Sequence, residues 1–253
     1  MFTWILLGLA GFAAGVINAV AGGGSLISFP ALLHTGMGAR IANATNTAAV
    51  WPGSAASVWP YRGVIAAEKH RAKVLAGPSL LGGLAGSWLL LHTSEAAFTA
   101  VVPWLILLAC ALLAVQGQVA AFVARRAGDT PARVPLTLLA VQFLISVYGG
   151  YFGAGIGILM LSAMAIFIPD GLQAANGLKV LFATLINGIS MVYFLAVGAV
   201  RLPEAGIMAA TSIAGGLVGA HVARRLPSGV LRVVVILYGV GVALRLFVAS
   251  SSP

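Results

Sequence analysis

The stretch GGGSLISFPALL fills residues 22–33, and GIGILMLSAMAI fills residues 155–166, 133 positions further along the chain. The same offset, without a gap, relates several other short motifs: Ala42-Asn43 with Ala175-Asn176, Ser57 with Ser190, Ser79 with Ser212, and Gly82-Gly83-Leu84 with Gly215-Gly216-Leu217. The chain is therefore an internal duplication. Repeats that contain glycine-interrupted hydrophobic segments are typical of secondary transporters, whose binding sites lie at such interruptions.

The composition is that of a membrane protein. Of the 253 residues, 60% are hydrophobic and 8% are charged, and the mean hydropathy is +1.05. A soluble globular domain carries about 25% charged residues. We therefore expect an all-α polytopic membrane protein without a soluble domain. The single cysteine, Cys110, excludes a disulfide and a cysteine metal site, and no metal or other cofactor is predicted. The basic residues that give the net charge of +9 gather in a few loops, which favours a role in orientation over nucleic-acid binding.

Apolar segments divide the chain into two similar halves. Repeat 1 covers residues 1–123 and repeat 2 covers 134–253, with a linker at 124–133. Each repeat is predicted to be a helical hairpin with a glycine-rich tip, followed by three transmembrane helices. The second arms of the hairpins are shorter than the about 20 residues that a full crossing needs. The predicted hairpins and spans are 2–35, 43–61, 74–92 and 98–123, then 134–169, 174–199, 203–222 and 231–249. This gives about 8–10 membrane segments, depending on whether the hairpins re-enter or cross.

Basic residues indicate the orientation. Ten of the 14 Lys and Arg residues lie in three predicted loops: Arg62, Lys69, Arg71 and Lys73; Arg125, Arg126 and Arg133; and Arg224, Arg225 and Arg232. The positive-inside rule places these loops, including the linker, in the cytoplasm. An odd number of crossings then separates equivalent points, so the repeats are predicted to be inverted, with both termini periplasmic. The alternative, one crossing plus a re-entrant loop per half, makes the repeats parallel and places Arg224 and Arg225 outside.

The glycine tips are the first candidate binding elements. A helix N-terminus presents unpaired N–H groups and a partial positive charge, and glycine lets a ligand approach the backbone. The tips contain Gly22, Gly23, Gly24 and Ser25 in the first repeat, and Gly153, Gly155 and Gly157 in the second. We expect Ser25 to cap the short helix and to offer its hydroxyl to a ligand. Close helix packing is the alternative for such glycines, and it is the preferred interpretation for Gly82, Gly83, Gly86 and their copies.

A polar stripe on the span after each hairpin is the second candidate. The stripe residues are Asn43, Asn46, Ser54 and Ser57 in repeat 1, with Thr47 beside them, and Asn176, Lys179, Asn187 and Ser190 in repeat 2. Their offsets place each set on one helix face. In a membrane such a face lies toward the protein interior or a water-filled path. Plain hydrogen bonding between helices is the alternative.

Lys179 is the most informative single residue. It lies inside a predicted span, and no Asp or Glu occurs in a span interior to pair with it. A bound anion would supply the missing counter-charge. The alternatives are extension of Lys179 to the lipid headgroups and a pair with Asp170. The lack of intramembrane carboxylates also disfavours a proton or sodium mechanism based on acidic residues.

The run GVINAVAGGGSLISFPALL (residues 15–33), followed by Gly36 and ANATN (42–46), resembles the TauE/SafE sulfite-exporter family. The second copy, residues 153–157 and ANGLK (175–179), is similar to that family's C-terminal motif, although Ile156 and Ile158 interrupt its glycine cluster. The resemblance covers nearly the whole chain. It implies an inner-membrane carrier that exports sulfite, sulfoacetate or a related small sulfur anion.

Together these patterns predict a secondary transporter of a small anion, such as sulfite or an organosulfonate, that works by alternating access between inverted repeats. The expected substrate-binding residues are Asn18, Gly22, Gly23, Gly24, Ser25, Asn43, Asn46, Gly153, Gly155, Gly157, Asn176 and Lys179. The expected pathway-lining residues are Thr47, Ser54, Ser57, Asn187 and Ser190. The expected partners are the anion and the lipid bilayer, and glycine-rich faces are compatible with a homodimer. Other candidates are an anion channel, a carrier of a non-sulfur solute and, least favoured, an intramembrane hydrolase using Ser54 and His221.

Overall fold

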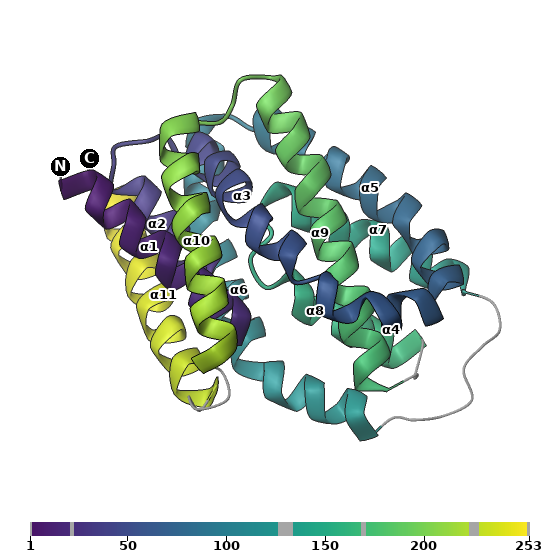
Figure 1. Ribbon diagram of the computed structural model, residues 1–253. Coiled ribbons are helices and arrows are strands. Elements are labelled where there is room, and N and C mark those ends of the chain that lie inside the picture. Colours follow the sequence, from purple (N-terminus) through teal and green to yellow (C-terminus); the bar gives the residue numbers. More distant parts are fainter. Residues whose placement is uncertain (1, 21–22, 126–133, 168–170, 223–227, 252–253) are drawn as a thin grey trace.

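The structure is a computed structural model that describes residues 2–20, 23–125, 134–167, 171–222 and 228–251 (Figure 1). In the first half the helices are α1 (Phe2–Val20), α2 (Ser25–Leu33), α3 (Ala39–Ala56), the short η1 (Trp59–Tyr61) and α4 (Arg62–Ala67), α5 (Lys69–His92) and α6 (Glu95–Arg125). In the second half they are α7 (Leu136–Tyr151), α8 (Ile156–Phe167), α9 (Leu172–Ala196), α10 (Leu202–Val222) and α11 (Ser228–Ser251).

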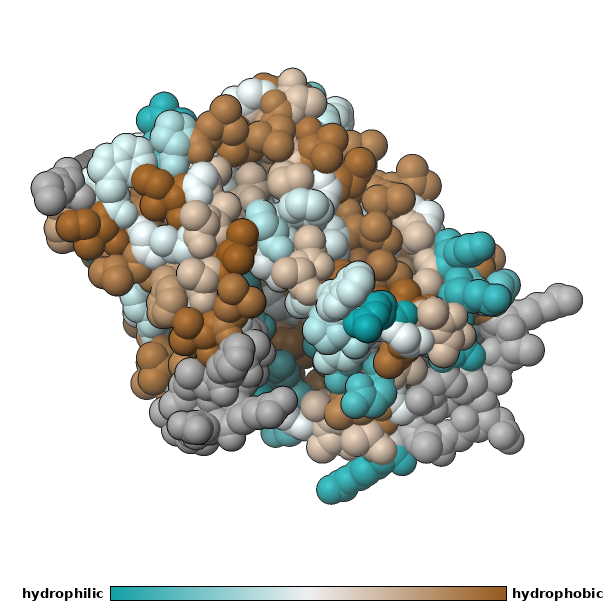
Figure 2. All heavy atoms as spheres, viewed as in Figure 1, coloured by the Kyte–Doolittle hydropathy of each residue, from teal (hydrophilic) through white to brown (hydrophobic). Residues whose placement is uncertain are grey.

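The expected all-helical membrane class is confirmed. Five helices, α5, α6, α9, α10 and α11, contain stretches long and apolar enough to cross a membrane, and α1, α7 and α8 are shorter apolar helices. The part of the chain that the structure describes contains no strand. Figure 2 shows hydrophobic side chains over the outer helices, including α1, α5 and α10, where a bilayer would surround the protein.

The predicted span at 43–61 is broken in the structure. Helix α3 ends at Ala56, and the chain continues through η1 and α4. Pro60 lacks the backbone N–H that would continue the helical hydrogen bonding, which accounts for the early end. Helix α3 is also too polar to count among the five long apolar helices. Its residues from Ala42 to Val50 are buried, so the other helices shield this polar segment.

Each hairpin packs its first arm on the other half of the chain. Helix α1 runs parallel to α10, and α7 runs parallel to α5. Glycine makes both crossings close. A Cβ atom at Gly86 would collide with the backbone oxygen of Val147, and one at Gly215 would collide with that of Phe12. The packing role expected for Gly82, Gly83 and Gly86 is therefore confirmed: Cβ atoms at Gly82 and Gly83 would also collide with α7 or α9.

Equivalent helices of the two halves run antiparallel where they meet. Thr45, early in α3, accepts a hydrogen bond from the N–H of Arg201, just beyond the end of α9. Trp51, later in α3, donates its indole N–H to the carbonyl oxygen of Thr184, in the middle of α9. Along α6, Trp104 packs on Phe247, and Cys110 lies 3.8 Å from the carbonyl oxygen of Ile236. In Figure 1 both termini lie at the same end of the bundle as the loops that join α2 to α3, α5 to α6, and α9 to α10. We call this the termini end, and the opposite end, which carries α4, the α4 end.

The basic residues of the first predicted loop lie at the α4 end, on α4 and the beginning of α5, where Figure 2 shows hydrophilic side chains gathered. Arg126, Arg133, Arg224 and Arg225 lie outside the described residues. Arg232 was expected in the same loop as the last two, and that expectation is wrong: Arg232 belongs to α11, and its guanidinium lies against Gly117 of α6.

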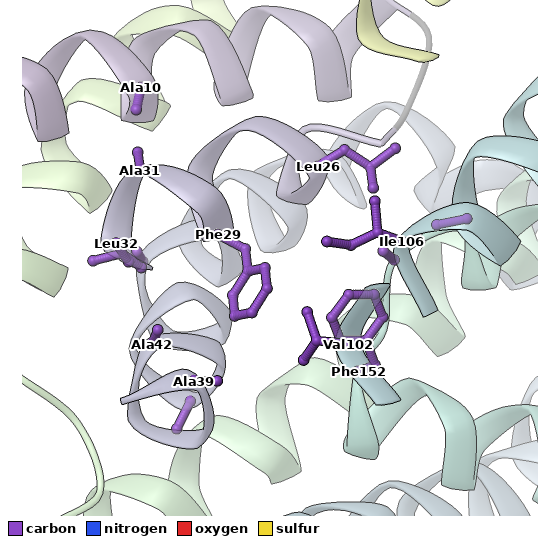
Figure 3. Close-up of a cluster of buried hydrophobic side chains, with 14 of the residues drawn as sticks. Ala10, Leu26, Phe29, Ala31, Leu32, Ala39, Ala42, Val102, Ile106 and Phe152 are labelled. Carbon is purple, nitrogen blue, oxygen red and sulfur yellow. The ribbon is translucent and has the colours of Figure 1, made fainter. Parts of the chain in front are cut away.

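The apolar core lies between the two hairpins. Phe29 of α2 and Phe152, which follows α7, meet edge to face with their ring centroids 5.6 Å apart. Val102 and Ile106 of α6 flank them (Figure 3). All four side chains are buried. The two hairpins are therefore joined by a tightly packed apolar contact against the same helix.

Replacing Gly86 by leucine is expected to destabilise the protein by about 1–3 kcal/mol, because the new side chain has to displace the backbone of α7. Gly77 lies on the same helix with open space around it and provides the control variant, Gly77→Leu. The measurement is the thermal unfolding midpoint of the purified proteins in detergent. Equal midpoints for the two variants would contradict the close crossing.

Candidate functional site

The first glycine tip is held by its own hairpin. Gly23 has a φ of +89°, a conformation that favours glycine. Gly24 is the N-cap of α2, and its N–H donates to Asn18 Oδ1 at 2.7 Å. The expectation that Ser25 caps this helix is wrong, since Ser25 is the first helical residue and the cap has no side-chain hydrogen bond. Gly22 lies outside the described residues.

The second glycine tip is closed by Tyr148. Its hydroxyl donates to the carbonyl oxygen of Ala154 at 2.6 Å, and both Gly153 (φ +80°) and Gly155 (φ +79°) adopt the left-handed conformation. A Cβ atom at Gly157 would lie 3.2 Å from Cδ of Lys179. The methylene chain of Lys179 therefore lies directly on the first turn of the short helix α8.

The two tips flank α6 at the same level. A Cβ atom at Gly23 would lie 3.4 Å from Leu113, and one at Gly155 would lie 3.2 Å from Leu112. With about 1.5 Å of rise per residue, these leucines lie about 26 Å from Glu95, at the start of α6, and about 18 Å from Arg125, at its end. Gly23 and Gly155 thus contact α6 well inside its ends.

The stripe on α3 is used to join the hairpins. Asn43 Nδ2 donates to the carbonyl oxygen of Tyr151, at the end of α7, at 2.9 Å. One turn later, Asn46 Oδ1 accepts from Ser28 Oγ of α2 at 2.5 Å. Thr47 Oγ1 donates to the carbonyl oxygen of Asn43. Asn43, Asn46 and Thr47 are buried, so in this conformation α3 makes the plain hydrogen bonds between helices that the sequence left as an alternative.

The stripe on α9 is more open. Lys179 Nζ donates to Asn176 Oδ1 at 2.9 Å, and Asn187 lies beside Gly153 with its amide donating to the carbonyl oxygen of Ala183. Asn176, Lys179 and Asn187 are half-buried, and only Ser190, farther along the stripe, is fully buried. The suggested partner Asp170 lies outside the described residues.

The remaining predicted lining residues make local hydrogen bonds within α3 and at its end. Ser54 Oγ donates to the carbonyl oxygen of Val50, and the exposed Ser57 Oγ donates to that of Ser54. Sequence reasoning missed Thr184, whose hydroxyl lies 3.1 Å from the Ser54 carbonyl oxygen, although it shares a face of α9 with Asn187. It also missed Ser28 and Tyr148, which have no repeated polar counterpart to reveal them.

Repeat-related residues differ in exposure, and the more exposed residues of each pair named below lie toward the α4 end of the bundle. Asn43 and Asn46 are buried, whereas their counterparts Asn176 and Lys179, toward the α4 end, are half-buried. Figure 2 shows the surface hollowed between α10 and α4. The structure is therefore closed toward the termini end and more open toward the α4 end.

A latch of polar contacts lies at the closed end. Glu95 accepts hydrogen bonds from the N–H of Ala39 and, at 2.9 Å, from Nε of Arg40, while Nη1 of Arg40 donates to the carbonyl oxygens of Leu91 and Thr93. A hollow of about 290 Å³ adjoins it, lined by Glu95 and seven neighbours. A second hollow of about 290 Å³ lies between α6 and α8. Neither includes a residue of the glycine tips.

The described residues contain no group of three or more His, Cys, Asp or Glu side chains that could hold a metal ion. His221, suggested as the base of a hydrolase, lies near the end of α10, where side chains are outside the description. The geometry is that of polar side chains and helix N-termini gathered around two backbone breaks. Such an arrangement can replace the hydration of a small solute without covalent chemistry.

Comparison with known proteins agrees with this geometry. The family described as "Sulfite exporter TauE/SafE" matches residues 7–246. A protein of Haemophilus influenzae named "Probable membrane transporter protein" is 31% identical over 220 residues, covering 85% of this chain and 83% of that protein. A probable membrane transporter protein of Sinorhizobium is 27% identical over 249 residues, covering 97% of this chain and 92% of that protein. No solved structure matches.

The difference in exposure predicts a difference in reactivity. In a background in which buried Cys110 is replaced by alanine, Lys179→Cys is expected to react with a small charged methanethiosulfonate reagent several times faster than Asn46→Cys, because position 179 is half-buried whereas position 46 is buried. The rates are measured by gel shift on membranes. Since the two positions are repeat-related, equal rates would show that the protein does not rest in the asymmetric conformation described here.

Proposed function

This chain belongs to the sulfite exporter TauE/SafE family, and from that premise we propose that it is a secondary transporter of a small anion, such as sulfite or an organosulfonate. The family and the names of the relatives make it a multi-pass membrane transporter and not an enzyme. In the proposal, the anion leaves the cell across the inner membrane by alternating access. The observation that carries it is Lys179, a half-buried lysine of α9 whose methylene chain lies on the first turn of α8.

Lys179 has the chemistry to bind an oxyanion. Its ammonium has three N–H donors, and one of them is directed to Asn176 Oδ1. Two donors are left for a ligand beside Gly157. The N-terminal turn of α8 adds a partial positive charge at the same place. Among the described carboxylates, Glu68, Glu95 and Glu204 are paired with arginines elsewhere. An anion at the second tip would therefore meet a cation that no described acid neutralises.

Antiparallel packing of equivalent helices supports inverted repeats. Because α3 is antiparallel to α9, and α6 is antiparallel to α11, the two halves can be related by a two-fold axis in the plane of the membrane. The basic residues on α4 and the start of α5 favour the α4 end as cytoplasmic. Both termini then lie in the periplasm.

Exchange of environment between the halves would provide alternating access. The described conformation opens toward the proposed cytoplasmic end, where Asn176 and Lys179 are half-buried. In the opposite conformation their counterparts Asn43 and Asn46 would open to the periplasm instead. This requires the contact between Phe29 and Phe152 to separate and the latch around Glu95 to break.

Removal of the Lys179 charge is the direct test of the substrate site. In proteoliposomes loaded with sulfite, Lys179→Gln is expected to raise the sulfite concentration that gives half-maximal counterflow about 10- to 100-fold. The reason is that a charge-assisted hydrogen bond contributes about 1.5–3 kcal/mol to binding. The exposed Lys73 supplies the matched control, Lys73→Gln, which should transport as the wild type does.

Three outcomes of that experiment are informative. Unchanged flux in Lys179→Gln would remove Lys179 from the site while leaving the carrier intact. Conductance without saturable counterflow would favour an anion channel. Absence of flux with sulfite, sulfate and sulfoacetate would overturn the anion assignment.

Weakening the latch is expected to open the closed end. Glu95→Ala removes the acceptor for both Ala39 and Arg40, so it should raise the reaction rate of Asn46→Cys with a methanethiosulfonate reagent several-fold. Glu204→Ala is the control, because among the described residues Glu204 pairs with the exposed Arg201 of its own segment and such pairs contribute little. No rise in rate with Glu95→Ala would show that the latch does not govern access.

A further inference from the structure

Two residues that occupy the same position in the two repeats are in contact where α3 crosses α9. Trp51 and Thr184 are separated by the repeat offset of 133, and the indole N–H of Trp51 donates to the carbonyl oxygen of Thr184 at 3.0 Å. Glycine at position 188 makes room for the indole, since a Cβ atom there would lie 2.8 Å from its nitrogen. The hydroxyl of Thr184 donates to the carbonyl oxygen of Ser54 at 3.1 Å. At this crossing, therefore, a residue of repeat 1 contacts its own copy in repeat 2.

A second pair of equivalent residues meets where α6 crosses α11. Ile106 and Gly239 are again 133 positions apart, and a Cβ atom at Gly239 would lie 3.7 Å from Cγ2 of Ile106. Figure 3 shows Ile106 in the apolar core, beside Leu26. In both pairs a large side chain of repeat 1 meets a small residue of repeat 2. Such a difference in size is expected where a residue faces its own copy, because two large side chains would need the same space.

The close glycine crossings of the two halves are equivalent as well. A Cβ atom at Gly82 of α5 would collide with α7 at the carbonyl oxygen of Phe143, and one at its copy, Gly215 of α10, would collide with α1 at that of Phe12. The copy of Phe12 is Ile145, two positions after Phe143 on α7. The crossing of α5 with α7 thus corresponds to the crossing of α10 with α1.

Contact between a residue and its copy has a simple meaning in a two-fold arrangement. A half-turn about the axis exchanges the two residues, so the midpoint between them lies on the axis. For the proposed inverted repeats, the axis would pass through the crossing at Trp51 and through the crossing at Ile106. When the halves exchange environments, each residue takes the place of its copy, and the distance between the two stays the same. The distance between residues that are not copies is free to change.

We propose that these two crossings are the pivot of the carrier, with Trp51 as the residue that positions α3 on α9 throughout the cycle. The pivot rests on the alternating access of the proposed function. The polar stripes lie on these same two helices, so they turn about the pivot while their exposure is exchanged. The contact of Phe29 with Phe152 is the opposite case. The copies of these residues are Ser162 and Ala19, so exchange of the halves separates the two rings.

Moving the indole to the other helix tests the position of the axis without transport. Thr184→Trp adds a second indole at the crossing and is expected to lower the thermal unfolding midpoint in detergent by about 5 °C, because the crossing becomes overpacked. Adding Trp51→Thr together with Ala55→Gly, at the copy of Gly188, should restore most of that loss. Leu195→Trp changes an exposed position of the same helix and should leave the midpoint unaltered. No recovery in the exchanged variant would overturn the axis.

Cross-linking distinguishes a pivot from an ordinary contact between helices. In the Cys110→Ala background, Trp51→Cys and Thr184→Cys are joined by a short bifunctional methanethiosulfonate, and the linked protein is expected to keep sulfite counterflow in proteoliposomes. The same link between Phe29→Cys and Phe152→Cys is the comparison, and it should abolish counterflow until the link is reduced. If the link between positions 51 and 184 also abolishes counterflow, the crossing is an ordinary contact and the pivot is overturned.

A failure of the transport function gives a different result. Absence of sulfite, sulfate and sulfoacetate flux in the unlinked protein would overturn the transport function alone. Acetylation of the half-buried Lys179 by a water-soluble reagent, followed by mass spectrometry, then reports exposure toward the α4 end without a substrate. The link between positions 51 and 184 should leave the acetylation rate unchanged, and an altered rate would overturn the pivot. Should that cysteine pair fail to fold, Ile106→Cys with Gly239→Cys gives the second pair, with the same expected results.

Discussion

A backbone break inside a membrane has to be covered, because lipid offers no partner for an exposed N–H or C=O group. This constraint accounts for the arrangement of the helices. Each glycine tip lies against α6, at Leu113 and Leu112. The first arms of the hairpins reach across to α10 and α5 through crossings that only glycine allows. The polar face of α3 is buried for the same reason, since its amides bond the neighbouring hairpins and not lipid.

The same covering elements determine which side of each break is open. Phe29 and Phe152 close the space between the hairpins toward the termini end, and the contacts of Arg40 with Glu95 fix the loop before α3. No comparable set of described contacts covers Lys179 at the other end. The residues that repeat at an offset of 133 thus differ in exposure between the two halves of the chain. That difference is what an alternating-access cycle would have to reverse.

The duplication, the helical class and the glycine crossings could be predicted from the sequence because each is a periodic or compositional property. The partners of the polar stripe could not. Asn43 bonds the carbonyl oxygen of Tyr151, 108 residues away, and spacing shows which face is buried but not what it meets. The capping role given to Ser25 failed because the turn at Gly23 places Gly24 at the cap. Arg232 was assigned to a loop because counting charges near span ends cannot detect a glycine on a facing helix.

The charge asymmetry of the repeats suggests how an anion would be coupled to the conformational change. Lys179 and Arg232 have the neutral counterparts Asn46 and Thr99. If the two halves exchange environments, Lys179 becomes as buried as Asn46 is in the described conformation. Burying an unpaired ammonium group costs several kcal/mol, whereas burying it with a bound anion costs far less. The empty carrier would then be held in the open conformation, and the loaded carrier would be free to change. An exchanger built in this way needs no intramembrane carboxylate, because its substrate is the counter-ion that permits the transition.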